Sequence, residues 1–533
     1  MEKLSFEGLP TPVIEYIGGL EDRLQKMQSQ IERLTETLLL AQKARFGPSS
    51  EKAKYILSEG YEQDTLFNEA EVFANVDEPE PIIVKQHTRK PKRTKEELAK
   101  NLPVVEVVID VPESERICGI CENGLSPIGR ELVRRELSII PAQAYVTETY
   151  RINYGCEKCM EESDEANIVK PEVPEPVVKR GLASPSSAAH VMYQKYANGM
   201  PLYRQEKDWR NLGVSISRAT LANWIIYTSL HWLLPLWFAM KALLLESPII
   251  LADETVVQVL KEPGKTPQSE SRMWVYCTGD VAWPPPIVLF EYQPSRAGEH
   301  PEAFLKIDHE FYLHTDGYSG YNSVGNAIHC GCFSHLRRKF EKAMPKGAPK
   351  DNKARIGFEY CQKLFDLERE FEKLTPENRL KEREKRSKPV LDEFYEWVGT
   401  VNPLAKSKLA EAIVYARNNK AQLSAILLDG RIELSTNRVE NRIRPFAVGR
   451  RAWLFADTVD GAKASAVAYS IVQTAVLNGL NPYQYLLLLF TELPTVLTKN
   501  PNADLSPYHP WSSVAREKCL LSQNANGLLR LPE

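Results

Sequence analysis

The sequence has no long uninterrupted apolar run. Its most apolar stretch, residues 230–252, is broken by Pro235, Lys241 and Glu246, whereas a membrane-spanning helix needs about 20 consecutive apolar residues. Residues 1–12 carry charge and contain no apolar core segment, which is unlike a secretion signal. We therefore expect a cytoplasmic protein of three or four domains.

The sequence also lacks an excess of charge of one sign. Its 67 Lys and Arg residues nearly balance its 70 Asp and Glu residues, which leaves a formal net charge of -3. A nucleic acid would therefore have to be bound by local basic patches, and either patch found here could equally be a solvated surface. The first patch includes Lys90, Lys92 and Arg93, and the second comprises Arg438, Arg442, Arg444, Arg450 and Arg451.

Cysteine is scarce, with nine residues in 533, and in a chain without a secretion signal this argues against a disulfide framework. Four of the nine form two CxxC pairs, Cys118 with Cys121 and Cys156 with Cys159, joined by strand-like alternation. Four thiolates are the tetrahedral set that a structural zinc ion prefers. We predict a zinc-ribbon-like, zinc-binding domain over residues 104–168; a redox or chance pairing is the alternative.

A heptad pattern occupies residues 14–46. Ile17, Leu24 and Ile31 recur at one core position, and a second apolar series runs beside them. This seam predicts a leucine-zipper-like coiled coil that makes the protein a homodimer or a higher oligomer. An amphipathic helix packed on its own domain is the alternative. Residues 47–103 then predict a linker with a basic arm suited to a phosphate backbone.

Residues 180–245 have a helical composition. Within them, residues 213–224 predict a turn followed by a capped helix. Such a unit is compatible with a helix-turn-helix, whose second helix would enter the major groove of DNA. A plain helical connector fits the pattern equally well.

Two apolar runs end in a carboxylate. Residues 249–253 end at Asp253, and residues 311–316 end at Asp316, directly before Gly317. Three more strands complete a set of five and favour a ribonuclease-H-like α/β fold within a multidomain α+β chain. These further strands are predicted at residues 273–278, 286–292 and 327–332.

Acids at neighbouring strand ends could hold divalent metal ions. Phosphodiester cleavage needs charge neutralisation on the attacking and leaving oxygens, and two Mg²⁺ or Mn²⁺ ions about 3.5–4 Å apart supply it. Glu440, on a later predicted helix, is the candidate third acid. Each acid also has a structural alternative: Asp253 could cap a strand end, and Asp316 could form a turn. Glu440 could belong to a capping box with Asn437.

Several longer motifs point to one family. In order they are residues 44–47, 50–52, the two CxxC pairs, 203–206, 213–224, 252–255, 295–296, 315–321, 332–340, 437–445, 449–455 and 473–486. With these motifs the chain resembles the transposase family of insertion sequence 66 over nearly its whole length. One departure is Asn441, which follows Glu440 where many members carry Arg.

The resemblance implies a DDE transposase, with Asp253, Asp316 and Glu440 as its catalytic, metal-binding triad. It implies a catalytic domain over residues 246–457 with a helical insertion at about 341–434, followed by a C-terminal helical region, 458–533. The implied partners are the DNA ends of a bacterial insertion sequence, target DNA and small accessory proteins of the same element, so the protein would be nucleoid-associated when bound to DNA. Arg337 and Arg338 join the basic patches as candidate DNA contacts.

Two alternatives remain open on the sequence. One is a metal-dependent nuclease that cuts DNA without joining it. The other is a catalytically inactive, transposase-derived DNA-binding protein, against which the presence of all three acids counts.

Overall fold

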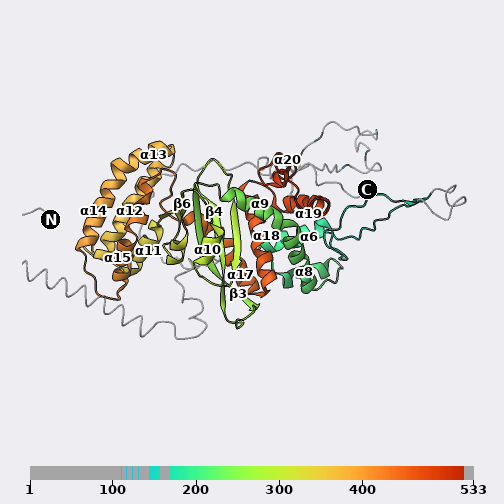
Figure 1. The fold of residues 1–533 in the computed structure, drawn as a ribbon, viewed down its shortest axis with the longest axis horizontal. Coiled ribbons are helices and arrows are strands. Elements are labelled where there is room, and N and C mark those ends of the chain that lie inside the picture. Colours follow the sequence, from blue (N-terminus) through green and yellow to red (C-terminus); the bar gives the residue numbers. More distant parts are fainter. Residues whose placement is uncertain are drawn as a thin grey trace, which may run out of the picture. The chain divides into compact units, whose positions relative to one another are not determined.

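The computed structural model describes residues 143–155 and 168–520, together with the single positions 110, 116, 123, 130 and 132. The predicted coiled coil, the linker with Lys90, Lys92 and Arg93, and the four cysteines of the predicted zinc site lie outside the described residues. The chain divides into two compact units. The described part of the first is Phe333–Gly430, called here the helical unit. The second, called the sheet unit, contains the described residues before and after it. The protein is thus a mixed helix-and-sheet chain of more than one domain (Figure 1).

A mixed sheet forms the centre of the sheet unit. Its strand order is β5-β4-β3-β6-β7, and β8 pairs with the far end of β3. β4 pairs antiparallel with both β3 and β5, whereas β6 pairs parallel with both β3 and β7. The bounds are β3 Ile249–Lys261, β4 Glu270–Thr278, β5 Val288–Gln293, β6 Phe311–His314, β7 Ala327–Cys330 and β8 Ala456–Thr458. A separate short ribbon pairs β1 (Tyr154–Gly155) with β2 (Ile168–Val169).

The two faces of the sheet are covered by different helices. The ring of Phe290 on β5 lies near Phe446 of α17 and Tyr469 of α18. On the other face, the ring of Tyr276 on β4 stacks on Phe304 of α10, with 3.7 Å between centroids. Because successive side chains of a strand point to opposite faces, the register of β3, β4 and β5 assigns each residue of the sheet to one of these layers.

The helices of the sheet unit precede and follow the sheet in the chain. Those before it are α6 (Pro185–Tyr196), α7 (Leu202–Asn211), α8 (Arg218–Thr228), the π-helical η2 (Ser229–Leu233) and α9 (Leu234–Leu244). Between strands of the sheet, the chain forms α10 (Glu299–Phe304) and η3 (Ser319–Ser323). The helices that follow the helical unit in the chain are α17 (Asn437–Trp453), α18 (Val459–Leu477), α19 (Pro482–Lys499), η6 (Ser506–Tyr508) and α20 (Ser513–Cys519). Among the described residues, none of the helices combines the length and apolarity needed to span a bilayer.

Helix α18 closes one edge of the sheet. It is rich in alanine and almost wholly buried, so it can approach β5 closely. The backbone N–H of Phe290 donates to Oγ of Ser470 at 2.8 Å, and Oγ1 of Thr474 donates to the carbonyl of Val288 at 3.0 Å. These hydroxyls satisfy backbone groups of β5 that would otherwise form an exposed sheet edge.

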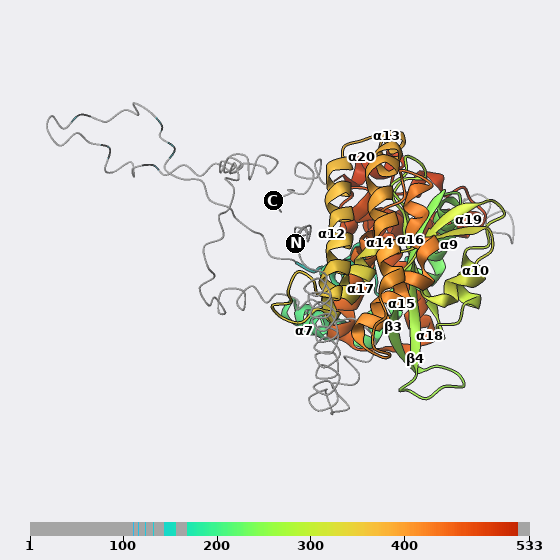
Figure 2. The same ribbon diagram turned by 90° about the vertical axis from the view of Figure 1, so that its left-hand side faces the viewer.

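The helical unit consists of helices alone. It contains α11 (Phe333–Ala343), α12 (Lys353–Phe371), α13 (Pro376–Glu382), η4 (Arg383–Ser387), α14 (Lys388–Thr400), α15 (Lys408–Asn418), α16 (Lys420–Ser424) and η5 (Ala425–Leu427). Figure 2 shows α12 and α14 side by side. The sequence predicts an insertion of about 341–434; the helical unit begins earlier, at Phe333, because α11 already belongs to it.

The segment predicted to form a turn and a capped helix contains α8. Gly213 follows α7 with a φ of +82°, which favours glycine at this position. The side chain of Ser217 accepts a hydrogen bond from the backbone N–H of Thr220 and so caps α8. The helix-turn-helix itself stays a prediction.

Candidate active site

Asp253 lies inside β3, not at a strand end. The prediction that the strand stops at this carboxylate is wrong, because β3 continues to Lys261 and stays paired with β4 as far as Gln258. The parallel partner β6, however, ends at His314, opposite Leu251. Asp253 is therefore the second residue of β3 beyond the end of its neighbour β6.

Asp316 follows β6 by two residues. If the parallel register of Leu251 with His314 is continued by two steps, Asp316 falls opposite Asp253. One of its oxygens, Oδ1, accepts the backbone N–H of Tyr318 at 2.8 Å, and Gly317 adopts a φ of +89°. Asp316 thus does form the turn that the sequence offered as its structural alternative, and this places its carboxylate next to β3.

Glu440 lies in the first turn of α17, which packs against β3 and β4. The helix begins at Asn437 and its N-cap is Thr436, so a capping box between Asn437 and Glu440 does not form. Instead, Oγ1 of Thr436 donates to Oε1 of Glu440 at 3.4 Å. Asp253 pairs with Val275, which lies opposite Phe290. The register therefore puts Asp253 on the sheet face that α17 covers.

Asp316 and Glu440 lie close enough to Asp253 for their charges to act on it. Asp253 is 6% exposed. Burial, and then the negative charges of Glu254, Asp316 and Glu440, raise the pKa of the Asp253 carboxyl well above its usual range. Carboxylates gathered around one buried acid repel it unless a cation neutralises them. Carboxylate oxygens are the type of ligand that a hard divalent ion such as Mg²⁺ prefers.

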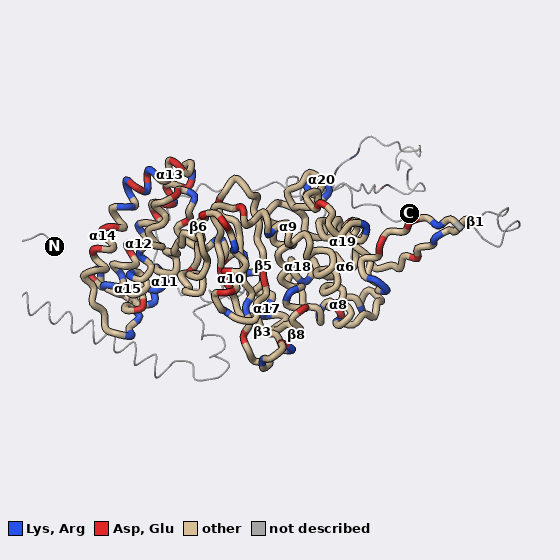
Figure 3. The backbone as a smooth tube through the Cα atoms, viewed as in Figure 1, with Lys and Arg blue, Asp and Glu red and all other residues tan. Residues whose placement is uncertain are grey.

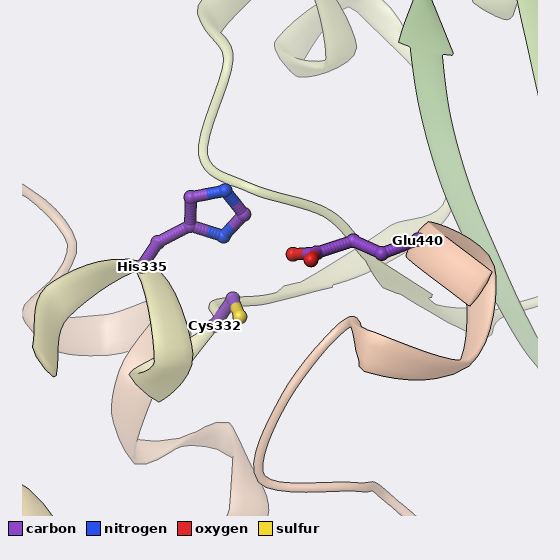
Figure 4. A group of neighbouring side chains, drawn as sticks. All are labelled: Cys332, His335 and Glu440. Atoms are coloured by element: carbon purple, nitrogen blue, oxygen red, sulfur yellow. The ribbon is translucent and has the colours of Figure 1, made fainter. Parts of the chain in front are cut away.

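A cysteine lies beside this cluster. Sγ of Cys332, which is fully buried, accepts the backbone N–H of Thr436 at 3.3 Å and lies within 4.8 Å of a carboxylate oxygen of Glu440. Figure 4 shows the two side chains; His335, also drawn there, belongs to the helical unit. The bond from Cys332 holds the N-terminus of α17, and with it Glu440, next to the end of β7.

Figure 3 marks the Lys and Arg positions of the described chain in blue. The arginines of α17 differ in whether they have partners within the protein. Arg438 donates to Glu433 at 2.5 Å, and Arg450 donates to the carbonyl of Val256, so both are engaged within the protein. Arg444 and Arg451 are exposed. They follow Glu440 by four and eleven residues, which places all three on one face of the helix. Arg442 is half-buried.

Arg337 and Arg338 of α11 have partners inside the helical unit. Arg337 donates to Oε1 of Gln362 at 3.0 Å, and its guanidinium lies 4.7 Å from the ring centroid of Phe365. Arg338 lies 3.4 Å from Nε2 of His335. Arg337 therefore stabilises the packing of α11 on α12.

Sequence reasoning missed two residues near the three acids. Glu254 is adjacent to Asp253 in the chain and buried, and it forms an ion pair with Arg296, 42 residues away. Both fall in motifs that carry the family resemblance, residues 252–255 and 295–296. These motifs could have marked both residues as candidates, but the spacing between the motifs does not predict that the two side chains form a pair.

Three family models match parts of the chain. A family model described as "Transposase IS66 family" matches residues 180–464, and one for the "zinc-finger binding domain of transposase IS66" matches residues 115–160. A third, "Transposase C of IS166 homeodomain", matches residues 33–107. These matches support a transposase-type function with DNA as partner, and they suggest the use of a divalent metal and of zinc.

Two uncharacterized proteins of Sinorhizobium fredii are similar to this chain. One, y4jD, is 31% identical over 406 residues, which cover 73% of this chain and 76% of that protein. The other, y4qI, is 27% identical over 505 residues, covering 91% of this chain and 89% of that protein. With a family model that spans more than half of its length, the chain belongs to the IS66 transposase family.

Proposed function

We propose that the protein is a DNA transposase that binds the ends of an insertion sequence and catalyses metal-dependent strand cleavage and strand transfer. The observation that carries this proposal is that the buried Asp253 has the carboxylates of Asp316 and Glu440 near it, at the place where β6 ends. Like charges gathered around a buried carboxylate destabilise the fold, and a bound cation would neutralise them. The sheet unit would then have the ribonuclease-H-like fold predicted from the sequence, since three antiparallel strands are followed by two parallel ones.

In this proposal Asp253, Asp316 and Glu440 supply the oxygen ligands of the metal site. Two bound Mg²⁺ or Mn²⁺ ions would neutralise charge on the attacking and leaving oxygens of the phosphodiester. Arg444 and Arg451, on the face of α17 that carries Glu440, would contact DNA phosphates. Hydrolysis at each element end frees a 3′ hydroxyl. That hydroxyl then attacks a phosphodiester of the target, forming one P–O bond as another breaks.

The remaining parts of the chain would serve assembly on DNA. We propose that Cys118, Cys121, Cys156 and Cys159 hold a structural zinc ion, which the match to a zinc-finger model supports. Residues 14–46 would join two or more copies of the chain, so that two element ends are held together. Lys90, Lys92 and Arg93 would follow the DNA backbone, and small accessory proteins of the same element are candidate partners.

The change Asp316→Asn is expected to abolish cleavage of supercoiled DNA that carries the element's ends. The amide still offers its oxygen to the N–H of Tyr318, so the turn persists, but it lacks the charge that a divalent cation needs. Cleavage should require Mg²⁺ or Mn²⁺ and stop with EDTA. Asp308→Asn is the matched control, because the Asp308 side chain is fully exposed.

Gel analysis of the nicked and cut products checks this expectation. Wild-type cutting at the element ends that is lost only in Asp316→Asn agrees with the proposal. A wild-type protein that binds the ends and cuts nothing would favour the inactive DNA-binding protein. Full cutting by Asp316→Asn would remove Asp316 from the site.

A further inference from the structure

Glu254 points to the opposite side of the sheet from Asp253. The two residues are adjacent in β3, so their side chains emerge on opposite faces. Glu254 pairs with Trp274 in the register of β3 with β4. The ring of Trp274 meets that of Tyr321 edge-on, with 5.5 Å between centroids. Glu254 therefore belongs to the layer formed by the segment after β6, not to the layer of α17 and Glu440.

Both oxygens of Glu254 already have donors within the protein. Oε1 receives Nε of Arg296 at 2.7 Å and lies 2.6 Å from Nη2 of the same guanidinium, and Oε2 receives the hydroxyl of Tyr321 at 2.8 Å. The Glu254 side chain is 3% exposed. A metal ion could take this carboxylate only by displacing these partners, and the buried Tyr321 hydroxyl would then lose its acceptor, which is costly.

Arg296 is held in one orientation but keeps part of its surface open. Its guanidinium lies 3.9 Å from the ring centroid of Tyr318, and the hydroxyl of that tyrosine donates to the backbone carbonyl of Arg296 at 2.7 Å. The Arg296 side chain nevertheless remains 40% exposed. A guanidinium has five N–H donors, and the contacts with Glu254 involve only two of its nitrogens.

The two loops that carry Arg296 and Tyr318 are locked together. Oγ of Ser323 donates to the carbonyl of Gly298 at 2.8 Å. A Cβ atom at Gly298 would lie 2.5 Å from the carbonyl oxygen of Gly320, so the backbones approach too closely for any side chain there. The guanidinium is thus fixed before any ligand arrives, and little conformational entropy remains to be lost on binding.

The exposed part of the Arg296 guanidinium can bind an anion that accepts its remaining N–H donors. Its charge interacts with that of Asp316, so it stands beside a cluster of carboxylates that would repel a DNA phosphate. An arginine binds phosphate through parallel N–H donors and offsets such repulsion. We propose that Arg296 binds a phosphate of the DNA strand next to the carboxylate cluster, and that Glu254 is a positioning residue for Arg296 and not a metal ligand. This inference rests on the proposed function, because it takes DNA as the ligand.

The test combines Arg296→Gln with DNA in which single phosphates are made neutral. Duplexes of the element's terminal sequence carry one methylphosphonate each, at successive positions around the cleavage point. Equilibrium binding is measured for wild type and variant, with Mg²⁺ and with EDTA. At one or two positions the neutral group should weaken wild-type binding by about 10- to 100-fold, with no further loss in Arg296→Gln. Additive effects at every position would overturn the inference.

Two further variants separate positioning from folding. Glu254→Gln should weaken binding at the same phosphate positions as Arg296→Gln. For Glu254→Gln, the Mg²⁺ concentration that gives half of the maximal rise in melting temperature should equal that of wild type. If this Mg²⁺ concentration is higher in Glu254→Gln but not in Arg296→Gln, Glu254 is a metal ligand and its assigned role is overturned. If Glu254→Gln does not fold, Tyr318→Leu, which removes the stacked ring, should weaken the same positions. If neutral phosphates weaken the binding of Tyr318→Leu at the same positions and as much as that of wild type, the inference is contradicted.

The matched control is Arg355→Gln. Arg355 has a similarly exposed side chain, 36%, and one glutamate partner, Glu359, so it should bind every duplex as wild type does. Binding is also measured in EDTA, so it does not depend on cleavage. A wild type that binds the duplexes but never cuts DNA would contradict the proposed function, and the effect of each neutral phosphate on wild type and variants could still be compared. A wild type that binds no duplex would overturn the inference as well.

Discussion

Replacing Asp253 by Asn is expected to lower the rate of element-end cleavage by at least about 10³-fold while end binding persists. A bound metal ion contributes several kcal/mol to stabilising the transition state, and each 1.4 kcal/mol corresponds to a factor of ten in rate. The local structure should survive, because the Asn oxygen can still accept the N–H of Glu254, now bound to Oδ1 of Asp253 at 2.8 Å. Rates are measured on labelled DNA ends, and binding by mobility shift.

The same variant should change how stability depends on pH and on metal. Burial and the neighbouring acids raise the pKa of Asp253 in the folded protein, so the folded state holds this proton more tightly than the unfolded state does. Without metal, the contribution of Asp253 to the free energy of unfolding is therefore greatest at low pH. It is lost as the pH rises through the raised pKa.

Melting curves with EDTA and with Mg²⁺ check these expectations. Asn does not titrate, so Asp253→Asn should lose this pH dependence and be at least as stable as wild type in EDTA at pH 8. Mg²⁺ should raise the melting temperature of wild type and of the control Asp308→Asn, but not that of Asp253→Asn. Undiminished cleavage, or unchanged stabilisation by Mg²⁺, in Asp253→Asn would contradict the assignment of this residue.

Replacing Arg383 by Met is expected to destabilise the helical unit by about 3–5 kcal/mol. Arg383 is fully buried in η4. It donates to both carboxylate oxygens of Glu368 on α12, at 2.8 and 2.7 Å, and to the carbonyls of Ile426 and Asp429, at 2.9 and 3.1 Å. Its loss would leave a largely buried carboxylate and buried carbonyls without their donor.

The neighbouring pair of Arg386 with Glu370 is the matched control. The contact is 2.6 Å, but the side chains are 38% and 59% exposed, so Arg386→Met should cost less than about 1 kcal/mol. Urea unfolding of the full chain and hydrogen exchange of the α12 and α14 amides report the difference. Adding Glu368→Met to Arg383→Met should recover part of the stability, because it removes the unpaired charge. Equal losses in Arg383→Met and Arg386→Met would contradict the account.

The sequence predicted the sheet strands better than it predicted their ends. Buried strands such as β3 and β6 begin as continuous apolar runs, which is why they could be located. The end of β3 was misplaced, because two successive carboxylates are unfavourable in a strand. Asp253 lies beyond the last residue of β3 that pairs with β6, so its surroundings depend on where β6 ends. Nothing in the local sequence shows where a neighbouring strand stops.

Side-chain partners were less predictable than the acids themselves. Asp253 and Asp316 were candidates because each ends an apolar run, and Glu440 because it lies on a later predicted helix; all three also lie in motifs that carry the family resemblance. The pairing of Glu254 with Arg296 depends on two loops meeting in space. Likewise, five arginines of α17 looked equivalent in the sequence. In the structure, Arg438 and Arg450 have partners within the protein, whereas Arg444 and Arg451 are exposed on the face of Glu440.

The central claim, that Asp253, Asp316 and Glu440 together serve strand transfer, is tested most directly by joining a pre-cut end to target DNA. A labelled duplex with the element's terminal sequence and a free 3′ hydroxyl is incubated with a supercoiled plasmid and Mg²⁺ or Mn²⁺. We expect label joined to the plasmid with wild-type protein, none with Glu440→Gln, and none with EDTA. Joining by Glu440→Gln at the wild-type rate, or a wild type that cuts element ends but never joins them, would contradict the claim.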